Sequence, residues 1–177
     1  MARDLHIGDN VLLAGTALTF GYEWEPFPPD LDCGAVAIAT DGTATTACFA
    51  ERECADGAIR HLGDNLVSGG ASEYEFTVVD FARLGIAYDR VLLFAMNVFA
   101  GNRIDKVDRI RMSVYAYGSA DCLHTCYADV DEGNANALVL AEVRRSPSGW
   151  VLTPVMRLVS AKFILDVGAA YLAAYSD

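Results

Sequence analysis

Short stretches in which apolar and polar residues alternate recur along most of this 177-residue chain. In the segment 17–24, Leu18, Phe20, Tyr22 and Trp24 occupy every second position. Because successive side chains of a β-strand point to opposite faces, this period gives the segment one apolar face. Similar stretches, separated by turn residues, follow one another along the chain and predict many strands.

Three further features organise these strands. The segment 89–99, DRVLLFAMNVF, is apolar on both faces, which predicts a central buried strand. The pair Asp41-Gly42 follows an apolar run and favours a hairpin. The stretch 146–149, SPSG, separates two other apolar runs and indicates a second hairpin.

Helical periodicity is found mainly at the end of the chain. Apolar residues spaced three or four apart over 160–175 predict a docked amphipathic helix, which Ser160 could cap. Short additional helices could occupy 52–59 or the acidic tract near Asp129. The chain is therefore predicted to be mainly β, a β-sandwich of two sheets with about ten strands and a C-terminal helix, forming a single domain over 1–177.

Composition excludes several classes of function. Thirteen basic and 24 acidic residues give a net charge of −11, which repels nucleic acid. The longest apolar run, 91–100, is much shorter than the roughly 20 residues of a membrane-spanning helix. The first residues have no apolar secretory segment, so we expect a cytoplasmic protein that is not integral to a membrane.

The five cysteines are odd in number and irregular in spacing, so we expect reduced thiols rather than a disulfide framework. The sequence has none of the common catalytic motifs, and we predict that the protein is not an enzyme. The stretch CLHTC offers Cys122, His124 and Cys126 on one face of a strand, where a weak three-ligand metal site is possible. The simpler interpretation is a partly buried strand face.

Two acidic stretches are the strongest candidates for a binding site. Asp30 and Asp32 lie two residues apart, so an extended backbone directs both carboxylates to one side. The second stretch, 63–75, combines acids and an amide with glycines that let a loop bend. Calcium takes six to eight oxygen ligands from such mixtures, although two unrelated polar turns would look the same. The candidate metal ligands are Asp30, Asp32, Asp64, Asn65, Glu73 and Glu75.

The order and spacing of several short motifs resemble the TerD-type tellurite-resistance and stress-response family. The matching motifs are IGDNVLL, GYEW followed by Glu25, DLD at 30–32, HLGDN, VVDF, and EVRRSPSGWVLTPV before the final helix. The resemblance implies a β-sandwich that binds calcium through the Asp-x-Asp loop and an acidic glycine loop. It also implies protein partners in a stress-response complex.

The glycine loop departs from the pattern of the family. Val67 and Ser68 replace a threonine and a glycine, Ser72 replaces a glycine, and Tyr74 replaces an aspartate. A tyrosine supplies no carboxylate charge at neutral pH, so the chain reads as a divergent member with one site weakened or lost. Two alternatives to calcium binding stay open: a calcium-independent interaction module of the same fold, or a thiol-based sensor that uses Cys122 and Cys126.

Overall fold

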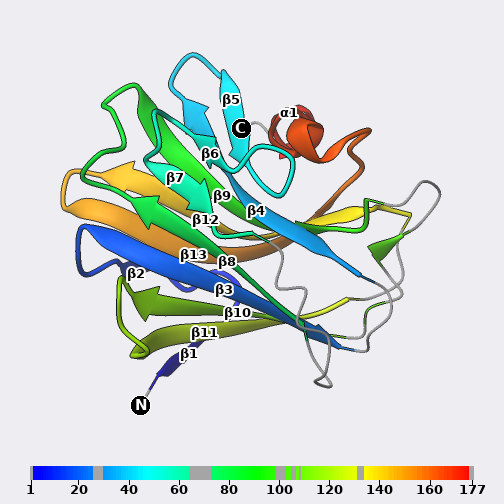
Figure 1. The fold of residues 1–177 in the computed structure, drawn as a ribbon, viewed down its shortest axis with the longest axis horizontal. Helices are drawn as coiled ribbons and strands as arrows, with labels where there is room; N and C mark the ends of the chain where they lie inside the picture. The colour runs from blue at the N-terminus through cyan, green and yellow to red at the C-terminus, as the bar shows by residue number, and fades with distance from the viewer. Residues whose placement is uncertain are drawn as a thin grey trace.

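The computed structural model describes residues 2–25, 30–63, 73–98, 103–104, 107, 109–130 and 134–175. These residues form two β-sheets packed face to face, with one helix on the outside (Figure 1). The seven-stranded sheet contains, in spatial order, β1 (Arg3–Leu5), β11 (Cys122–Asp129), β10 (Arg109–Ala116), β3 (Ala17–Glu25), β8 (Glu73–Asp80), β7 (Ile59–His61) and β6 (Glu53–Cys54). The six-stranded sheet contains β2 (Val11–Leu12), β13 (Gly149–Val159), β12 (Ala137–Ser146), β9 (Tyr88–Met96), β4 (Asp32–Ala39) and β5 (Ala44–Ala47). The predicted two-sheet β-sandwich is confirmed.

Strand β3 shows how sequence alternation builds the core. Leu18, Phe20, Tyr22 and Trp24 are all buried, and they point between the two sheets. The intervening residues of β3 lie on the opposite face of the seven-stranded sheet, as the two-residue period requires. The main core therefore fills the space between the sheets.

Strand β9 is central and buried on both faces, as predicted. Three of its side chains enter the core between the sheets, and three enter a second apolar cluster on the outer face of the six-stranded sheet. The inner set is Val91, Leu93 and Ala95, and the outer set is Leu92, Phe94 and Met96. A strand covered on both sides needs no polar face, which explains its continuous apolar run.

Both predicted hairpins are present. Strands β4 and β5 are joined through Asp41-Gly42, where Gly42 has φ +86°, and the Ala39 N–H donates to the Thr43 carbonyl at 2.8 Å. Strands β12 and β13 are joined through the second turn, where Ser146 pairs with Gly149. The two hairpins lie in opposite halves of the six-stranded sheet, on either side of β9.

The C-terminal helix begins later than predicted. The Ala161 N–H donates to Asn136 Oδ1 at 3.0 Å, which ties this part of the chain to the segment before β12. A 3₁₀ turn, η2 (Ile164–Asp166), then leads into helix α1 (Val167–Tyr175). Asp166, rather than Ser160, caps this start, because its Oδ2 accepts the Phe163 N–H at 3.2 Å. Helix α1 covers the second apolar cluster, where a methyl group added at Gly168 would lie 2.6 Å from Val36 Cγ1.

The short helix considered for 52–59 is wrong. The segment 52–59 contains β6, the start of β7 and a turn between them. That turn has positive φ at Ala55, Asp56 and Gly57, which a right-handed helix cannot contain. Asp129 is the last residue of β11 and pairs with Arg109 of β10, whereas residues 131–133 of the acidic tract that follows lie outside the described residues. Within the described ranges, no helix has the length and apolar character needed to cross a membrane.

Candidate functional site

The described ends of the two acidic stretches, at Asp32 and at Glu75, lie close together at one end of the sandwich. Strand β4 begins at Asp32 in one sheet, and β8 begins at Glu73 in the other. Of the six candidate ligands, the structure places three side chains: Asp30 is exposed, whereas Asp32 and Glu75 are buried. Asp64 and Asn65 lie outside the described residues, and only the backbone of Glu73 is described, paired with Trp24.

Glu75 links the two sheets through its side-chain hydrogen bonds, next to these stretches. Its Oε2 accepts the backbone N–H of Cys33 at 2.5 Å and lies 3.3 Å from His61 Nε2. Cys33 belongs to β4 of one sheet, while His61 and Glu75 belong to β7 and β8 of the other. Because Cys33 follows Asp32 directly, this hydrogen bond fixes the backbone at the end of the Asp-x-Asp stretch.

His61 extends the same network to the start of the glycine loop. Its Nδ1 accepts the Gly63 N–H at 3.2 Å, so in the neutral ring the proton lies on Nε2 and is donated to Glu75. The side chain is buried, and both ring nitrogens are used without a charge on the ring. His61 belongs to the HLGDN motif but is not among the ligands predicted from the sequence.

Negative charge gathers around this network. Burial raises the pKa of the Cys33 thiol well above its ordinary value, and the carboxylates of Glu75, Asp32 and Asp30 raise it further. Burial likewise raises the pKa of Tyr22, whose hydroxyl donates to the Gly34 carbonyl at 3.0 Å. Acids from both stretches thus act on one buried thiol, and such an accumulation of negative charge favours a nearby cation.

One positive charge already stands beside the glycine loop. A methyl group added at Gly63 would lie 3.0 Å from Arg52 Nη1, so the guanidinium rests against this glycine. The Arg52 carbonyl also accepts the His61 N–H at 2.8 Å. A fixed positive charge at the loop opposes the approach of a divalent cation and lowers its affinity.

The described acids do not make a complete metal centre by themselves. Among the residues that the structure describes, no three His, Cys, Asp or Glu side chains are grouped closely enough to hold a metal ion. A calcium site here would need oxygens from the part of the glycine loop outside those residues. One Glu75 oxygen is already bonded to Cys33 and His61, which suits this residue to holding the loops in place.

Tyr74 points away from this site. It lies between Glu73 and Glu75 on β8, and its hydroxyl donates to Glu23 Oε1 at 2.7 Å on the outer face of the seven-stranded sheet. Strand alternation therefore separates Tyr74 from the face that carries Glu75. The tyrosine that departs from the family pattern stabilises the outer sheet face.

The CLHTC segment lies on β11 but does not form a three-ligand cluster. The register shifts beside Tyr115, so Cys122 pairs with Tyr115 while His124 pairs with Val114, and the expected alternation is broken. Burial raises the pKa of Cys126 to about 12, and burial together with Arg3 lowers the pKa of His124. All five cysteines are free thiols, and of these only Cys122 is partly exposed.

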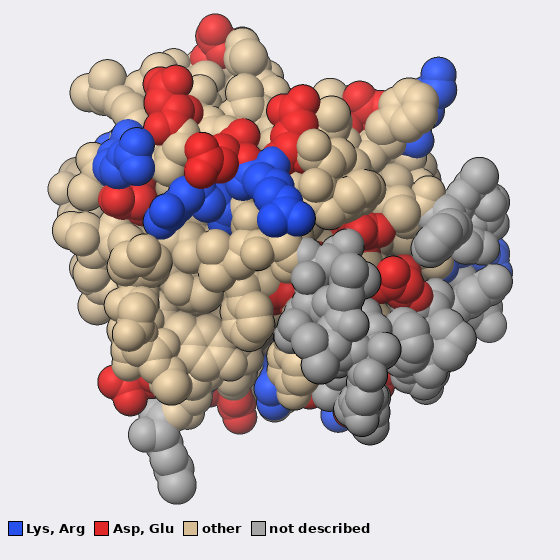
Figure 2. Space-filling model, in the orientation of Figure 1, with Lys and Arg blue, Asp and Glu red and all other residues tan. Residues whose placement is uncertain are grey.

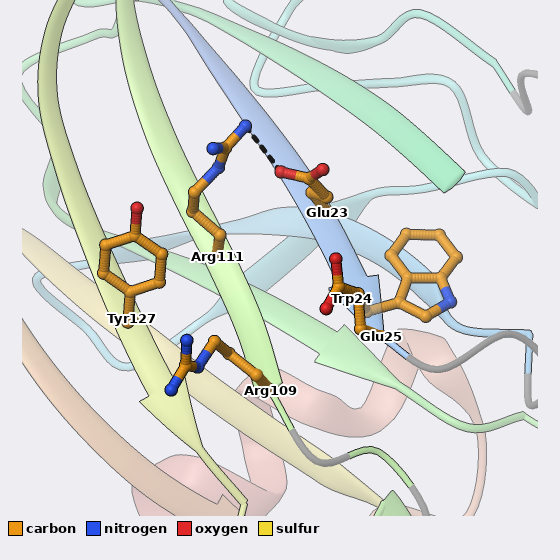
Figure 3. Close-up of a pocket in the computed structure, with 6 residues that line it drawn as sticks. All are labelled: Glu23, Trp24, Glu25, Arg109, Arg111 and Tyr127. Atoms are coloured by element: carbon orange, nitrogen blue, oxygen red, sulfur yellow. Dashed lines mark ion pairs between the residues drawn. The ribbon is translucent and has the colours of Figure 1, made fainter. Parts of the chain in front are cut away.

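A small hollow on the outer face of the seven-stranded sheet is filled with paired charges (Figure 3). It has a volume of about 140 Å³ and lies over β3, β10 and β11. Arg111 Nη2 lies 2.5 Å from Glu23 Oε2, and Arg109 Nε lies 3.0 Å from Asp129 Oδ1. Figure 2 likewise shows Lys and Arg side chains interspersed with Asp and Glu on the visible face. The charged side chains of this hollow pair with one another across neighbouring strands, so we assign them a structural role in the sheet.

The geometry defines a class of protein: a two-sheet β-sandwich in which a buried glutamate joins the described ends of two acidic stretches. The TerD domain matches residues 1–162, and the chain belongs to the TerD family. Among solved structures it is similar to a homologue of telluride resistance protein (TerD) from Streptomyces coelicolor A3(2), with 22% identity, a TM-score of 0.61, and coverage of 85% of this chain and 94% of that chain. A solved protein of unknown function has 21% identity and a TM-score of 0.62, covering 82% of this chain and 91% of its own. No curated protein matches the chain.

Proposed function

We propose that this protein is a non-enzymatic, cytoplasmic calcium-binding member of the TerD family that acts in a chemical-stress response, including resistance to tellurium compounds. The observation that carries the proposal is the bridge from Glu75 to Cys33 and His61, which joins the ends of the two acidic stretches. The tellurium role rests on family membership and on the telluride-resistance name of a structural relative. Calcium would order the loops so that they present one surface to a protein partner.

In this proposal the ligand oxygens come from both stretches. Asp30 and Asp32 supply one group, and Asp64, Asn65 and Glu73 supply the other. Glu75 holds the two stretches at a fixed separation through its bonds to Cys33 and His61. Calcium suits such a set because it accepts carboxylate, amide and backbone oxygens in flexible geometry.

A calcium-independent interaction module is the second candidate, and two observations favour it. The Glu75 network already joins the two stretches through protein hydrogen bonds. Arg52 also places a positive charge at the loop without a metal. Both features reduce the stabilisation that calcium can give to the two stretches. We therefore expect weak binding, with a dissociation constant on the order of 10⁻⁵ to 10⁻³ M.

Calcium is expected to raise the melting temperature by about 3–6 °C at roughly ten times its dissociation constant. Ligand at that concentration stabilises the native state by about 1.4 kcal/mol, which corresponds to such a shift for a domain of this size. Asp64→Ala should remove the shift, because it removes a carboxylate ligand. The measurement is thermal unfolding followed by circular dichroism with and without calcium.

Magnesium at equal ionic strength is the control for general screening of an acidic surface. It should shift the melting temperature less, because it retains its water and demands tight octahedral geometry. Equal shifts with both ions, unchanged by Asp64→Ala, would show that the loops are solvated turns. The calcium-independent module would then be the better description.

A further inference from the structure

A second hollow lies on the outer face of the seven-stranded sheet, apart from the acidic stretches. It has a volume of about 390 Å³, within the usual range for small-molecule sites. Its base is a row of three cross-strand neighbours, in which Val78 of β8 pairs with Thr19 of β3 and with Arg60 of β7. The turn 117–120 between β10 and β11 supplies one wall, and Leu62 contributes to the rim.

The apolar surface of this hollow comes from its walls and rim. Val78 is only 2% exposed, yet it belongs to neither of the two apolar clusters of the fold. Its neighbour Val79 enters the core between the sheets, so alternation directs Val78 to the outer face. Leu62 and Tyr117 beside it are 56% and 55% exposed. Because Val78 is already covered by the protein, the exposed Leu62 and Tyr117 side chains are the surface that can bury the apolar part of a ligand.

Arg60 supplies the charge of this hollow. Its Nη2 lies 3.4 Å from the Tyr117 hydroxyl, and in the part of the chain that the structure describes no carboxylate is within ion-pair distance of it. Glu53, its cross-strand neighbour, instead has its Oε2 beside Gly57. Arg109 and Arg111, on the same sheet face, are each paired with an acid. Unlike these two arginines, Arg60 has a guanidinium that can bind an anion.

We propose that this hollow binds a small organic acid, with one carboxylate on Arg60 and an apolar body against Leu62 and Tyr117. A guanidinium donates two parallel hydrogen bonds to a carboxylate, and the Tyr117 hydroxyl can donate a third. One positive charge matches a monoanion, whereas the net charge of −11 disfavours phosphates and other multiply charged ligands. The site is independent of calcium and of the loops at the end of the sandwich.

The test is a titration of ¹⁵N-labelled protein with 3-phenylpropionate in calcium-free, low-salt buffer. We expect a dissociation constant on the order of 1 mM, with shifted amide resonances for Val78, Leu62 and the turn 117–120. Acetate, which has no apolar body, and the neutral 3-phenylpropionamide should each bind at least about tenfold more weakly.

Variants distinguish this site from general binding to the surface. Arg60→Gln should weaken 3-phenylpropionate binding at least about tenfold, whereas the matched Arg109→Gln, which removes an acid-paired arginine from the same face, should leave it unchanged. Leu62→Asp, at an exposed position, should also weaken binding by charge repulsion, and circular dichroism checks that each variant is folded. Equal binding of the acid and its amide, or unchanged binding in both Arg60→Gln and Leu62→Asp, would overturn the proposal.

Discussion

Between pH 8 and pH 11 the free energy of unfolding is expected to fall by about 6 kcal/mol, because buried thiols resist ionisation in the native state. Burial raises the pKa of Cys54 to about 11 and that of Cys126 to about 12, and it raises that of Cys33 well above the ordinary value. In the unfolded chain these thiols ionise near pH 8.5. A raised native pKa gives stability that is complete below the unfolded pKa and is lost as pH rises towards the native value.

The magnitude follows from the number of thiols. Each pKa unit is worth about 1.4 kcal/mol, so Cys54 and Cys126 lose roughly 3 kcal/mol each by pH 11, and Cys33 adds to the loss in the same direction. This sum is comparable with the whole stability of an ordinary domain, so the protein should unfold in mild alkali. The measurement is urea unfolding at several pH values under a phosphine reductant.

Two single variants test the assignment. Cys126→Ala should remove about 3 kcal/mol of the pH dependence, because the largest cause of its raised pKa is burial. Cys122→Ala, at the partly exposed cysteine of the same strand, should change the pH dependence little. An unfolding free energy that is flat up to pH 11, or equal effects of the two variants, would contradict buried, protonated thiols. Such a result would also favour the alternative in which Cys122 and Cys126 act as a thiol-based sensor.

Glu75→Ala is expected to destabilise the protein by about 3 kcal/mol at neutral pH. The change leaves the Cys33 N–H and the His61 Nε2–H without their acceptor, and each buried unsatisfied donor costs about 1–3 kcal/mol. For a domain of this size, that corresponds to a fall of about 6–12 °C in melting temperature. Glu75→Gln should cost less, because its amide oxygen can still accept one of these bonds.

Glu25→Ala is the matched control, because Glu25 is an exposed glutamate at the end of β3. A surface change of this kind should alter stability by no more than about 0.5 kcal/mol. If Glu75→Ala and Glu25→Ala have the same effect, then Glu75 does not link the sheets in solution. The proposed site would in that case lose its support.

Features with a local sequence signal were predictable. The alternation in β3 and the doubly apolar run of β9 report burial on one and two faces, and the hairpin turns carry Asp41-Gly42 and Gly149. The start of α1 was not predictable, because it depends on the distant Asn136, which bonds to Ala161. A side chain 25 residues away leaves no trace in the helical period.

The candidate site was predictable only in part, for a similar reason. Carboxylate spacing and family resemblance singled out Asp32 and Glu75, and the structure brings their two strands together through Cys33. The contact between His61 and Glu75 depends on the register of β7 against β8, and the break within CLHTC depends on a register shift of β10 against β11. Strand register arises from pairing between distant segments, so single-segment patterns do not reveal it.

The most direct measurement of the central claim is a calcium titration of ¹⁵N-labelled protein, observed at the amides of Cys33 and Gly63. These amides donate to the two ends of the Glu75–His61 network, one beside each acidic stretch. If calcium binds between the stretches, both resonances should shift with a single dissociation constant on the order of 10⁻⁵ to 10⁻³ M, and magnesium should produce much smaller shifts. If neither amide responds, or if calcium and magnesium cause the same small shifts over the whole acidic surface, calcium does not bind at this end of the sandwich.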